Sequence, residues 1–159
     1  MDMLVKLYDL PQILPEDLVQ TETRGIVIRR AMAPEKHLVV RWVRETFGHT
    51  WGNETDIAFG NQPISCFIAV DNKQIVGFAC YEVTARNFFG PTGVAESHRG
   101  LGLGKILFLR ALHALRELGY AYAIIGGVGP AGFYTKIAGA IEIPDSTPGI
   151  YKGLLKENG

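Results

Sequence analysis

The chain has 159 residues, of which 47% are hydrophobic and 20% are charged, and its basic and acidic side chains give a formal net charge of zero. This profile is typical of a globular protein that can bury a core, and we expect a single domain over residues 1–159. Because no long basic block occurs and no apolar run approaches the roughly 20 residues that cross a bilayer, we expect neither nucleic acid nor a membrane as a partner.

The first half of the chain mixes strand and helix signals. Residues 3–8 form a candidate strand, and residues 9–25, rich in turn formers, are interpreted as a connecting segment. Residues 1–24 are therefore expected to be an N-terminal extension, an extra strand plus a linker. The β-branched run 25–31 predicts a strand, and residues 33–48 predict a helix with one apolar face. Residues 49–63 suggest a loop with room for one short helix.

The second half begins with a hairpin signal, two apolar runs joined by turn residues. The next expected strand is interrupted by Gly90, Pro91 and Gly93, which indicates a bulge. The expected order is then strand, helix, strand, helix and strand, which predicts an α/β (α+β) fold with a mixed, mostly antiparallel sheet of about six to seven strands flanked by helices. The expected ranges are strands at 64–70, 74–83, 87–95, 120–128, 140–144 and 149–155, and helices at 105–118 and 130–140.

Two cysteines, Cys66 and Cys80, stand in apolar runs without the spacing of a metal site. We expect two buried reduced thiols in preference to a disulfide, and no bound metal. The first residues lack the basic flank and long apolar stretch of a secretory signal, so the expected location is cytoplasmic.

Gly100, Gly102 and Gly104 alternate where an expected strand leads into a helix. Free backbone N–H groups at the positive end of a helix dipole bind phosphate groups, so a phosphate-binding loop is predicted here. The nucleoside triphosphate loop requires a Ser or Thr after the lysine, but Ile106 follows Lys105. The dinucleotide loop requires a glycine where Lys105 stands.

A third pattern, (Arg/Gln)-x-x-Gly-x-(Gly/Ala), fits residues 99–104 without a gap. In this loop the chain resembles the GCN5-related N-acetyltransferase (GNAT) superfamily. Residues 94–99 are similar to the family's Val-x-Pro-x-x-Arg, with Glu96 in place of the proline, and residues 133–140 are similar to its FYxKxGF segment. The resemblance covers roughly residues 25–143.

The resemblance implies transfer of an acetyl group from acetyl-CoA, a cosubstrate, to a primary amine of a small molecule or peptide, without a metal. It implies that the backbone N–H of Val94 polarises the thioester carbonyl and that Tyr134 donates a proton to the leaving thiolate. The residues expected to hold coenzyme A are Val94, Arg99, Gly100, Leu101, Gly102, Leu103, Gly104 and Lys105. Many family members carry an asparagine where this chain has Gly127.

The general base is left open between a side chain and a chain of water molecules. Glu82 is the first candidate because it could point into the cleft, and Glu96, His98 and His49 are alternatives.

The acceptor is expected near a polar and aromatic cluster that includes Trp51, Asn53 and Glu54, with Asp56 beside them. A solvated loop with one anchoring tryptophan explains this cluster equally well. Acidic side chains there would suit a cationic amine.

Two other functions remain open on the sequence alone. The chain could be a non-catalytic acyl-CoA-binding sensor or regulatory domain, or it could be a nucleotide-binding module. Members of the family often form homodimers, which leaves the oligomeric state open, and the strand-like segment at residues 3–8 could pair across such a dimer.

Overall fold

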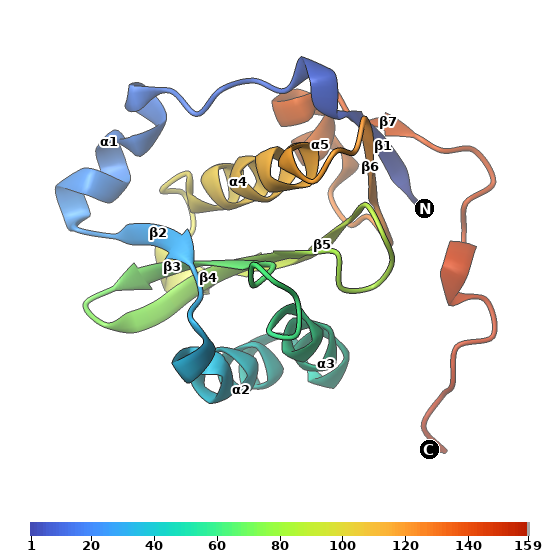
Figure 1. The fold of residues 1–159 in the computed structure, drawn as a ribbon, viewed down its shortest axis with the longest axis horizontal. Coiled ribbons are helices and arrows are strands. Elements are labelled where there is room, and N and C mark those ends of the chain that lie inside the picture. The colour runs from blue at the N-terminus through green and yellow to red at the C-terminus, as the bar shows by residue number, and fades with distance from the viewer. Residues whose placement is uncertain (159) are drawn as a thin grey trace.

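The computed structural model describes residues 1–158, which form one seven-stranded sheet between two layers of helices (Figure 1). The strand order is β2-β3-β4-β5-β6-β1-β7, and every neighbouring pair is antiparallel except β5–β6. The expected fold class is therefore confirmed. The strands are β1 Met3–Lys6, β2 Val27–Arg30, β3 Cys66–Asp71, β4 Gln74–Tyr81, β5 Phe88–Val94, β6 Tyr122–Ile125 and β7 Ile141–Glu142.

The helices divide between the two faces of the sheet, with α1, α4 and α5 on one face and α2 and α3 on the other (Figure 1). Their bounds are α1 Pro15–Arg24, α2 Lys36–Phe47, α3 His49–Ala58, α4 Leu103–Glu117 and α5 Ala131–Ala138. Short 3-10 helices lie at Leu7–Asp9, Ala33–Glu35, Glu96–His98 and Gly149–Tyr151. No helix within residues 1–158 is long and apolar enough to cross a membrane.

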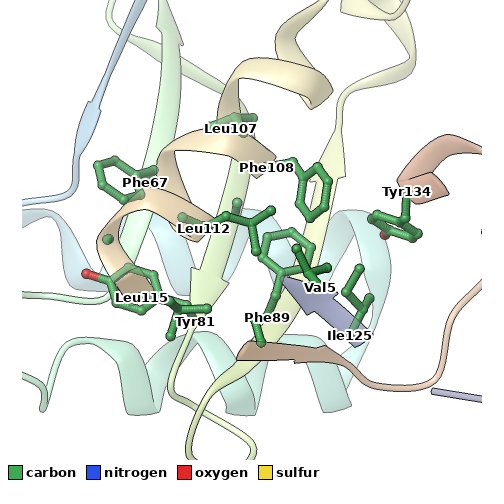
Figure 2. Close-up of a cluster of buried hydrophobic side chains, with 14 of the residues drawn as sticks. Val5, Phe67, Tyr81, Phe89, Leu107, Phe108, Leu112, Leu115, Ile125 and Tyr134 are labelled. Carbon is green, nitrogen blue, oxygen red and sulfur yellow. The ribbon is translucent and has the colours of Figure 1, made fainter. Parts of the chain in front are cut away.

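The main core lies between the sheet and α4 (Figure 2). Leu107, Leu112 and Leu115 of α4 are fully buried against aromatic side chains from the strands. Phe89 and Phe108 meet edge to face with ring centroids 4.8 Å apart. Burying one such side chain stabilises the fold by about 1.5–3 kcal/mol, so α4 is firmly packed on the sheet. The position of the loop that leads into α4 at Leu103 is fixed as a result.

Residues 9–25 are not only a connecting segment, because they contain the ten-residue helix α1. Pro15 occupies the first turn, the Asp17 carboxylate accepts a hydrogen bond from the Leu14 N–H at 2.8 Å, and Gly25 ends the helix in the left-handed conformation. Thr21 is the one buried residue of this helix, and its sequence PEDLVQTETR is mostly polar, which is why the segment resembles a connecting segment in the sequence.

Residues 49–63 contain a longer helix than expected, the ten-residue α3, which follows α2 after Gly48 alone. Gly52 lets the two helices approach closely, since a Cβ there would lie only 3.0 Å from the Arg44 Cβ. The close packing holds α3 against the sheet near β4 and β5.

The strand expected at residues 149–155 is wrong, because Gly149–Tyr151 forms a 3-10 helix outside the sheet. The N-terminal β1 contributes a strand to this side of the sheet instead, lying between β6 and β7. Met3 pairs with Ile125 on one side and Glu142 on the other, so β1 pairs inside its own sheet and not across a dimer.

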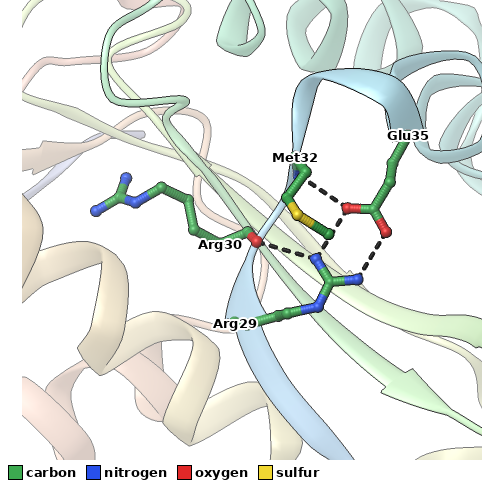
Figure 3. Close-up of polar contacts among 4 residues, drawn as sticks. All are labelled: Arg29, Arg30, Met32 and Glu35. Carbon is green, nitrogen blue, oxygen red and sulfur yellow. Dashed lines mark hydrogen bonds and ion pairs between the residues drawn. The ribbon is translucent and has the colours of Figure 1, made fainter.

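The passage from β2 to α2 is fixed by an ion pair (Figure 3). Arg29 donates two hydrogen bonds to the Glu35 carboxylate, at 2.8 and 2.6 Å, and Glu35 also accepts one from the Met32 N–H. The guanidinium lowers the pKa of Glu35, because it stabilises the charged carboxylate. The pair therefore holds the turn that carries the chain from the sheet to the opposite helix layer.

Candidate functional site

A bulge in β5 turns part of that strand away from regular pairing. Ala79 pairs with Thr92 and Tyr81 pairs with Phe89, so β5 holds one more residue than β4 between these pairs, as the sequence indicated. Ala95 donates to the Val76 carbonyl at 2.8 Å, which makes Val94 and Gly77 a non-hydrogen-bonded pair. The N–H of Val94 therefore points away from β4.

The other neighbour of β5 is β6, and the two strands pair only at Phe88 with Ile124 and Phe89 with Ile125. Beyond Phe89 they separate, and a cleft of about 760 Å³ lies along the separation, lined by Phe89, Val94, Ile125 and Val128 among others. This is the volume of a small-molecule or cofactor site. The N–H of Val94 faces this gap, where no neighbouring strand pairs with it to accept its hydrogen bond.

The two ends of the glycine loop, Arg99 and Gly104, line the cleft, whereas Gly100 and Gly102 lie outside the lining residues. Gly100 and Gly102 have φ angles of +83° and +80°, which favour glycine, so the path of the chain itself requires glycine at both positions. Gly104 has no such angle; it lines the cleft, and a Cβ there would face Phe133 Cζ at 3.7 Å. The first turn of α4, whose N–H groups have no partner within the helix, borders the cleft at Gly104. Arg99, which precedes the loop, lines the same cleft.

Not every residue expected to hold coenzyme A reaches the cleft. The Leu103 side chain is buried in the core and Leu101 packs against that core, so only their backbone groups could serve a ligand. The Lys105 ammonium bonds the Asp17 carboxylate of α1 at 2.8 Å, and this contact lowers the pKa of Asp17. The structure places Val94, Arg99 and Gly104 on the cleft wall and ties Lys105 to α1.

Tyr134, in α5, lines the cleft. Its ring packs edge to face on Phe108 with centroids 5.1 Å apart (Figure 2). The residue is 7% exposed, and its burial raises the pKa of the phenol. Within residues 1–158, every fully enclosed polar atom of a side chain has a hydrogen-bond partner. The Tyr134 hydroxyl has no such partner in this part of the chain, so it is not enclosed, and it faces the open part of the cleft. It is therefore a protonated donor facing the cleft.

Glu82 does not line the cleft. Its carboxylate accepts hydrogen bonds from the Asn87 N–H at 2.5 Å and from the Tyr120 hydroxyl at 3.1 Å, so it closes the β4–β5 loop. The other candidate bases, Glu96, His98 and His49, also lie outside the lining residues. The structure thus brings none of the four to the cleft.

The helix α3 presents Trp51 and Glu54 to the cleft, while Asn53 is exposed and lies outside the lining residues. Glu54 accepts a hydrogen bond from the Thr84 hydroxyl at 2.5 Å. Tyr151, from the C-terminal segment, completes this part of the wall. The pKa of Tyr151 is raised by its burial and further by the negative charges of Glu54 and of Asp2.

Asp2 organises the two terminal segments beside the cleft. Its carboxylate accepts a hydrogen bond from the Gly127 N–H at 3.1 Å, and its own N–H donates to the Ser146 hydroxyl at 2.8 Å. The N–H of Gly127 is thus hydrogen-bonded to Asp2. Thr84, Tyr151 and Asp2 were missed from the sequence, because each reaches the site through contacts between distant segments. No group of three potential metal-binding side chains occurs in the described part of the chain.

The model of the acetyltransferase (GNAT) family matches residues 36–139, and the chain belongs to this family. Its members are acetyltransferases. The match contains the bulged strand β5, the glycine loop and Tyr134, and it leaves out β1, α1, β7 and the C-terminal segment. No curated protein matches the chain.

Solved structures share the fold at low sequence identity. A glucosamine N-acetyltransferase region of a fungal multi-domain β-N-acetylglucosaminidase superposes over 86% of this chain with a TM-score of 0.69 and 14% identity. An N-acetyltransferase of this family from Sphaerobacter thermophilus covers 88% of the chain with a TM-score of 0.61 and 18% identity. The chain spans only 19% and 47% of those two proteins. A family acetyltransferase from Brucella melitensis, solved with acetyl-CoA, covers 71% of this chain and 81% of its own length with a TM-score of 0.54 and 17% identity.

Proposed function

We propose that this protein is an N-acetyltransferase that moves an acetyl group from acetyl-CoA to a primary amine. The observation that carries the proposal is one cleft whose walls hold a free strand N–H at Val94, a glycine loop with Arg99 at a helix N-terminus, and the phenol of Tyr134. These three groups would polarise the thioester carbonyl, bind the phosphates of the donor and protonate the leaving thiolate, respectively. The structure of the Brucella melitensis relative with acetyl-CoA supports the choice of donor.

The residues divide the work by position along the cleft. Arg99 and the first N–H groups of α4 bind the pyrophosphate of the donor. The thioester lies along β5, where the Val94 N–H donates a hydrogen bond to the carbonyl oxygen as negative charge develops on it. The amine nitrogen bonds to the carbonyl carbon, the carbon–sulfur bond breaks, and the sulfur keeps the electron pair and takes the proton of the Tyr134 phenol. The nitrogen, now bonded to the acetyl carbon, loses one proton through solvent in the cleft, and the Tyr134 phenolate takes up a proton, so that a neutral amide and a neutral phenol result. Because burial raises the pKa of this phenol, the donor stays protonated at neutral pH.

Melting with ligands tests donor binding. Coenzyme A at about 100 times its dissociation constant should stabilise the protein by about 2.7 kcal/mol and raise the melting temperature by roughly 5–10 °C. NAD and ATP should not do so at equal concentration. Arg99→Gln should reduce the shift, whereas Arg116→Gln, at the far end of α4, should leave it unchanged. An equal shift with NAD or ATP would indicate a nucleotide-binding module.

Thiol release tests turnover. Acetyl-CoA is incubated with a panel of amines, and free coenzyme A and the acetylated product are both measured. Amine-dependent release supports the proposal. A clear melting shift with coenzyme A but no release with any amine would favour a non-catalytic acyl-CoA sensor and refute catalysis.

A further inference from the structure

The walls of the cleft carry opposite charges at two places. Among the residues that line it, Arg99 is the single cation and Glu54 the single carboxylate. Arg99 precedes the loop into α4, which covers one face of the sheet, whereas Glu54 belongs to α3, which covers the other face (Figure 1). The donor's phosphates suit the cation, so the end of the cleft at Glu54 is left for the acceptor.

Glu54 is held in place and still has an open side. Thr50, Trp51 and Glu54 lie on one face of α3, at positions i, i+1 and i+4, and all three line the cleft. The Thr84 hydroxyl donates to Oε2 of Glu54, and no residue among 1–158 donates to Oε1. One carboxylate oxygen is therefore anchored, and the other is available to a ligand.

The surroundings of Glu54 are apolar and aromatic. Trp51 and Phe88 line the cleft near it, and Tyr151 and Leu154 come from the C-terminal segment. The Tyr151 ring packs over Gly126, where a Cβ would lie 3.2 Å from the Tyr151 hydroxyl. This segment lies outside residues 36–139, so the acceptor wall is built partly from a region beyond the family match.

We propose that the acceptor is a primary amine with an apolar, uncharged substituent, which binds as an ammonium ion to Glu54 between Trp51 and Tyr151. This proposal rests on the proposed acetyl transfer. The ammonium nitrogen gives one proton to Oε1 of Glu54, and its freed electron pair then forms the bond to the acetyl carbon. The nitrogen gives up its second surplus proton as the Tyr134 phenolate is reprotonated, and Glu54 returns its own proton to solvent. Aromatic faces attract a cation, and the apolar wall accepts an alkyl or aryl substituent. A carboxylate on the acceptor would be repelled by Glu54, and a sugar would lose hydrogen bonds to water.

Kinetics with 2-phenylethylamine as the probe tests the role of Glu54. At pH 7, Glu54→Gln should lower kcat/KM by about 10²–10⁴-fold, the range of a lost general base. The loss should shrink as the pH approaches 10, because the free amine then becomes abundant and needs no base. Tyr134, Tyr151 and Arg99 also face this cleft and Asp2 lies beside Tyr151, so the pH profile of the Glu54→Gln variant is compared with that of wild type instead of being interpreted alone.

A matched control is Glu45→Gln, the same change at an exposed position of the neighbouring helix α2, which should leave the kinetics unchanged. A second variant, Tyr151→Ala, should raise KM for 2-phenylethylamine at least fivefold and change kcat less. Coenzyme A should raise the melting temperature of all these proteins equally, which shows that each variant folds and keeps the donor site.

The outcomes separate this inference from the proposed function. If wild type shows no melting shift with coenzyme A, the donor assignment fails. If wild type acetylates amines but Glu54→Gln is as active as wild type at pH 7, the Glu54 inference alone is overturned. A preference for glucosamine or glycine over 2-phenylethylamine and butylamine overturns the substrate class. Calorimetric titration of 2-phenylethylamine into the coenzyme A complex adds a test without turnover, because absent binding also overturns it.

Discussion

Replacing Tyr134 with phenylalanine separates a catalytic phenol from a packing side chain. The ring lies in the core, in contact with Phe108 and Phe133, so the ring itself must be kept. The hydroxyl makes no hydrogen bond within residues 1–158 and faces the cleft, so its removal should change the free energy of unfolding by no more than about 0.5 kcal/mol. That corresponds to a change in melting temperature of about 2 °C or less.

The effect on turnover should be far larger. Loss of a general acid lowers rates by about 10²–10⁴-fold, so kcat of Tyr134→Phe should fall at least a hundredfold, while the melting shift with coenzyme A stays as in wild type. Thiol release under saturating acetyl-CoA measures kcat, with Tyr122→Phe, an exposed tyrosine of β6, as the control.

The pH dependence gives a second check of the same residue. Burial raises the pKa of Tyr134 above the usual value of 10.0, so the wild-type rate should not fall through loss of this proton below pH 10. An unchanged kcat in Tyr134→Phe would refute the acid role, and a melting temperature lowered by many degrees would show that the hydroxyl has a structural role.

Three further predictions concern the glycine loop, the bulged strand β5 and the turn between β2 and α2. Gly102→Ala should lower stability by about 1–2 kcal/mol, because alanine is strained at φ +80°, and should weaken the coenzyme A melting shift. Gly93→Ala should lower stability by about 1–3 kcal/mol in urea unfolding, since the new Cβ would lie 2.4 Å from the Phe47 ring. Glu35→Gln should remove part of the acid sensitivity of the fold. The pKa of Glu35 is lowered by Arg29, so this pair stabilises the protein above the usual carboxyl pKa of 4.5, and the stabilisation is lost as the pH falls from there through the lowered pKa of Glu35. Urea unfolding of both proteins at pH 7 and pH 3 measures this contribution, which should be about 1 kcal/mol or less.

Local sequence signals were sufficient for the elements that dominate the core. The helix expected at residues 105–118 forms as Leu103–Glu117, and the hairpin and bulged strand form as Cys66–Asp71, Gln74–Tyr81 and Phe88–Val94. These elements contain many buried apolar residues, so the sequence indicates them clearly. The helices α1 and α3 are mostly polar and bury few side chains, and the features that define them, a capping carboxylate at Asp17 and a close approach at Gly52, are tertiary or local contacts that apolar content does not indicate.

The residues of the site divide in the same way. Arg99, Gly104 and Tyr134 belong to short motifs, so their shared cleft could be anticipated. On the sequence alone, Glu82 is the first candidate base and Glu54 is part of the acceptor cluster, because the sequence does not show which carboxylate faces the cleft. Their tertiary contacts distinguish them. The Glu82 carboxylate accepts hydrogen bonds from the Asn87 N–H and the Tyr120 hydroxyl, whereas Glu54 lines the cleft.

The two terminal segments contribute to the end of the cleft proposed to bind the amine. β1 lies between β6 and β7, and Asp2 at its start binds both the Gly127 N–H and, through its own N–H, the Ser146 hydroxyl. The C-terminal segment that follows Ser146 carries Tyr151 to the acceptor wall. The proposed donor side is thus built from the part of the chain that matches the family, and the proposed acceptor side combines α3, which lies inside the match, with the C-terminal segment outside it. Changes in Asp2 or Tyr151 should therefore alter the choice of amine more than the affinity for coenzyme A.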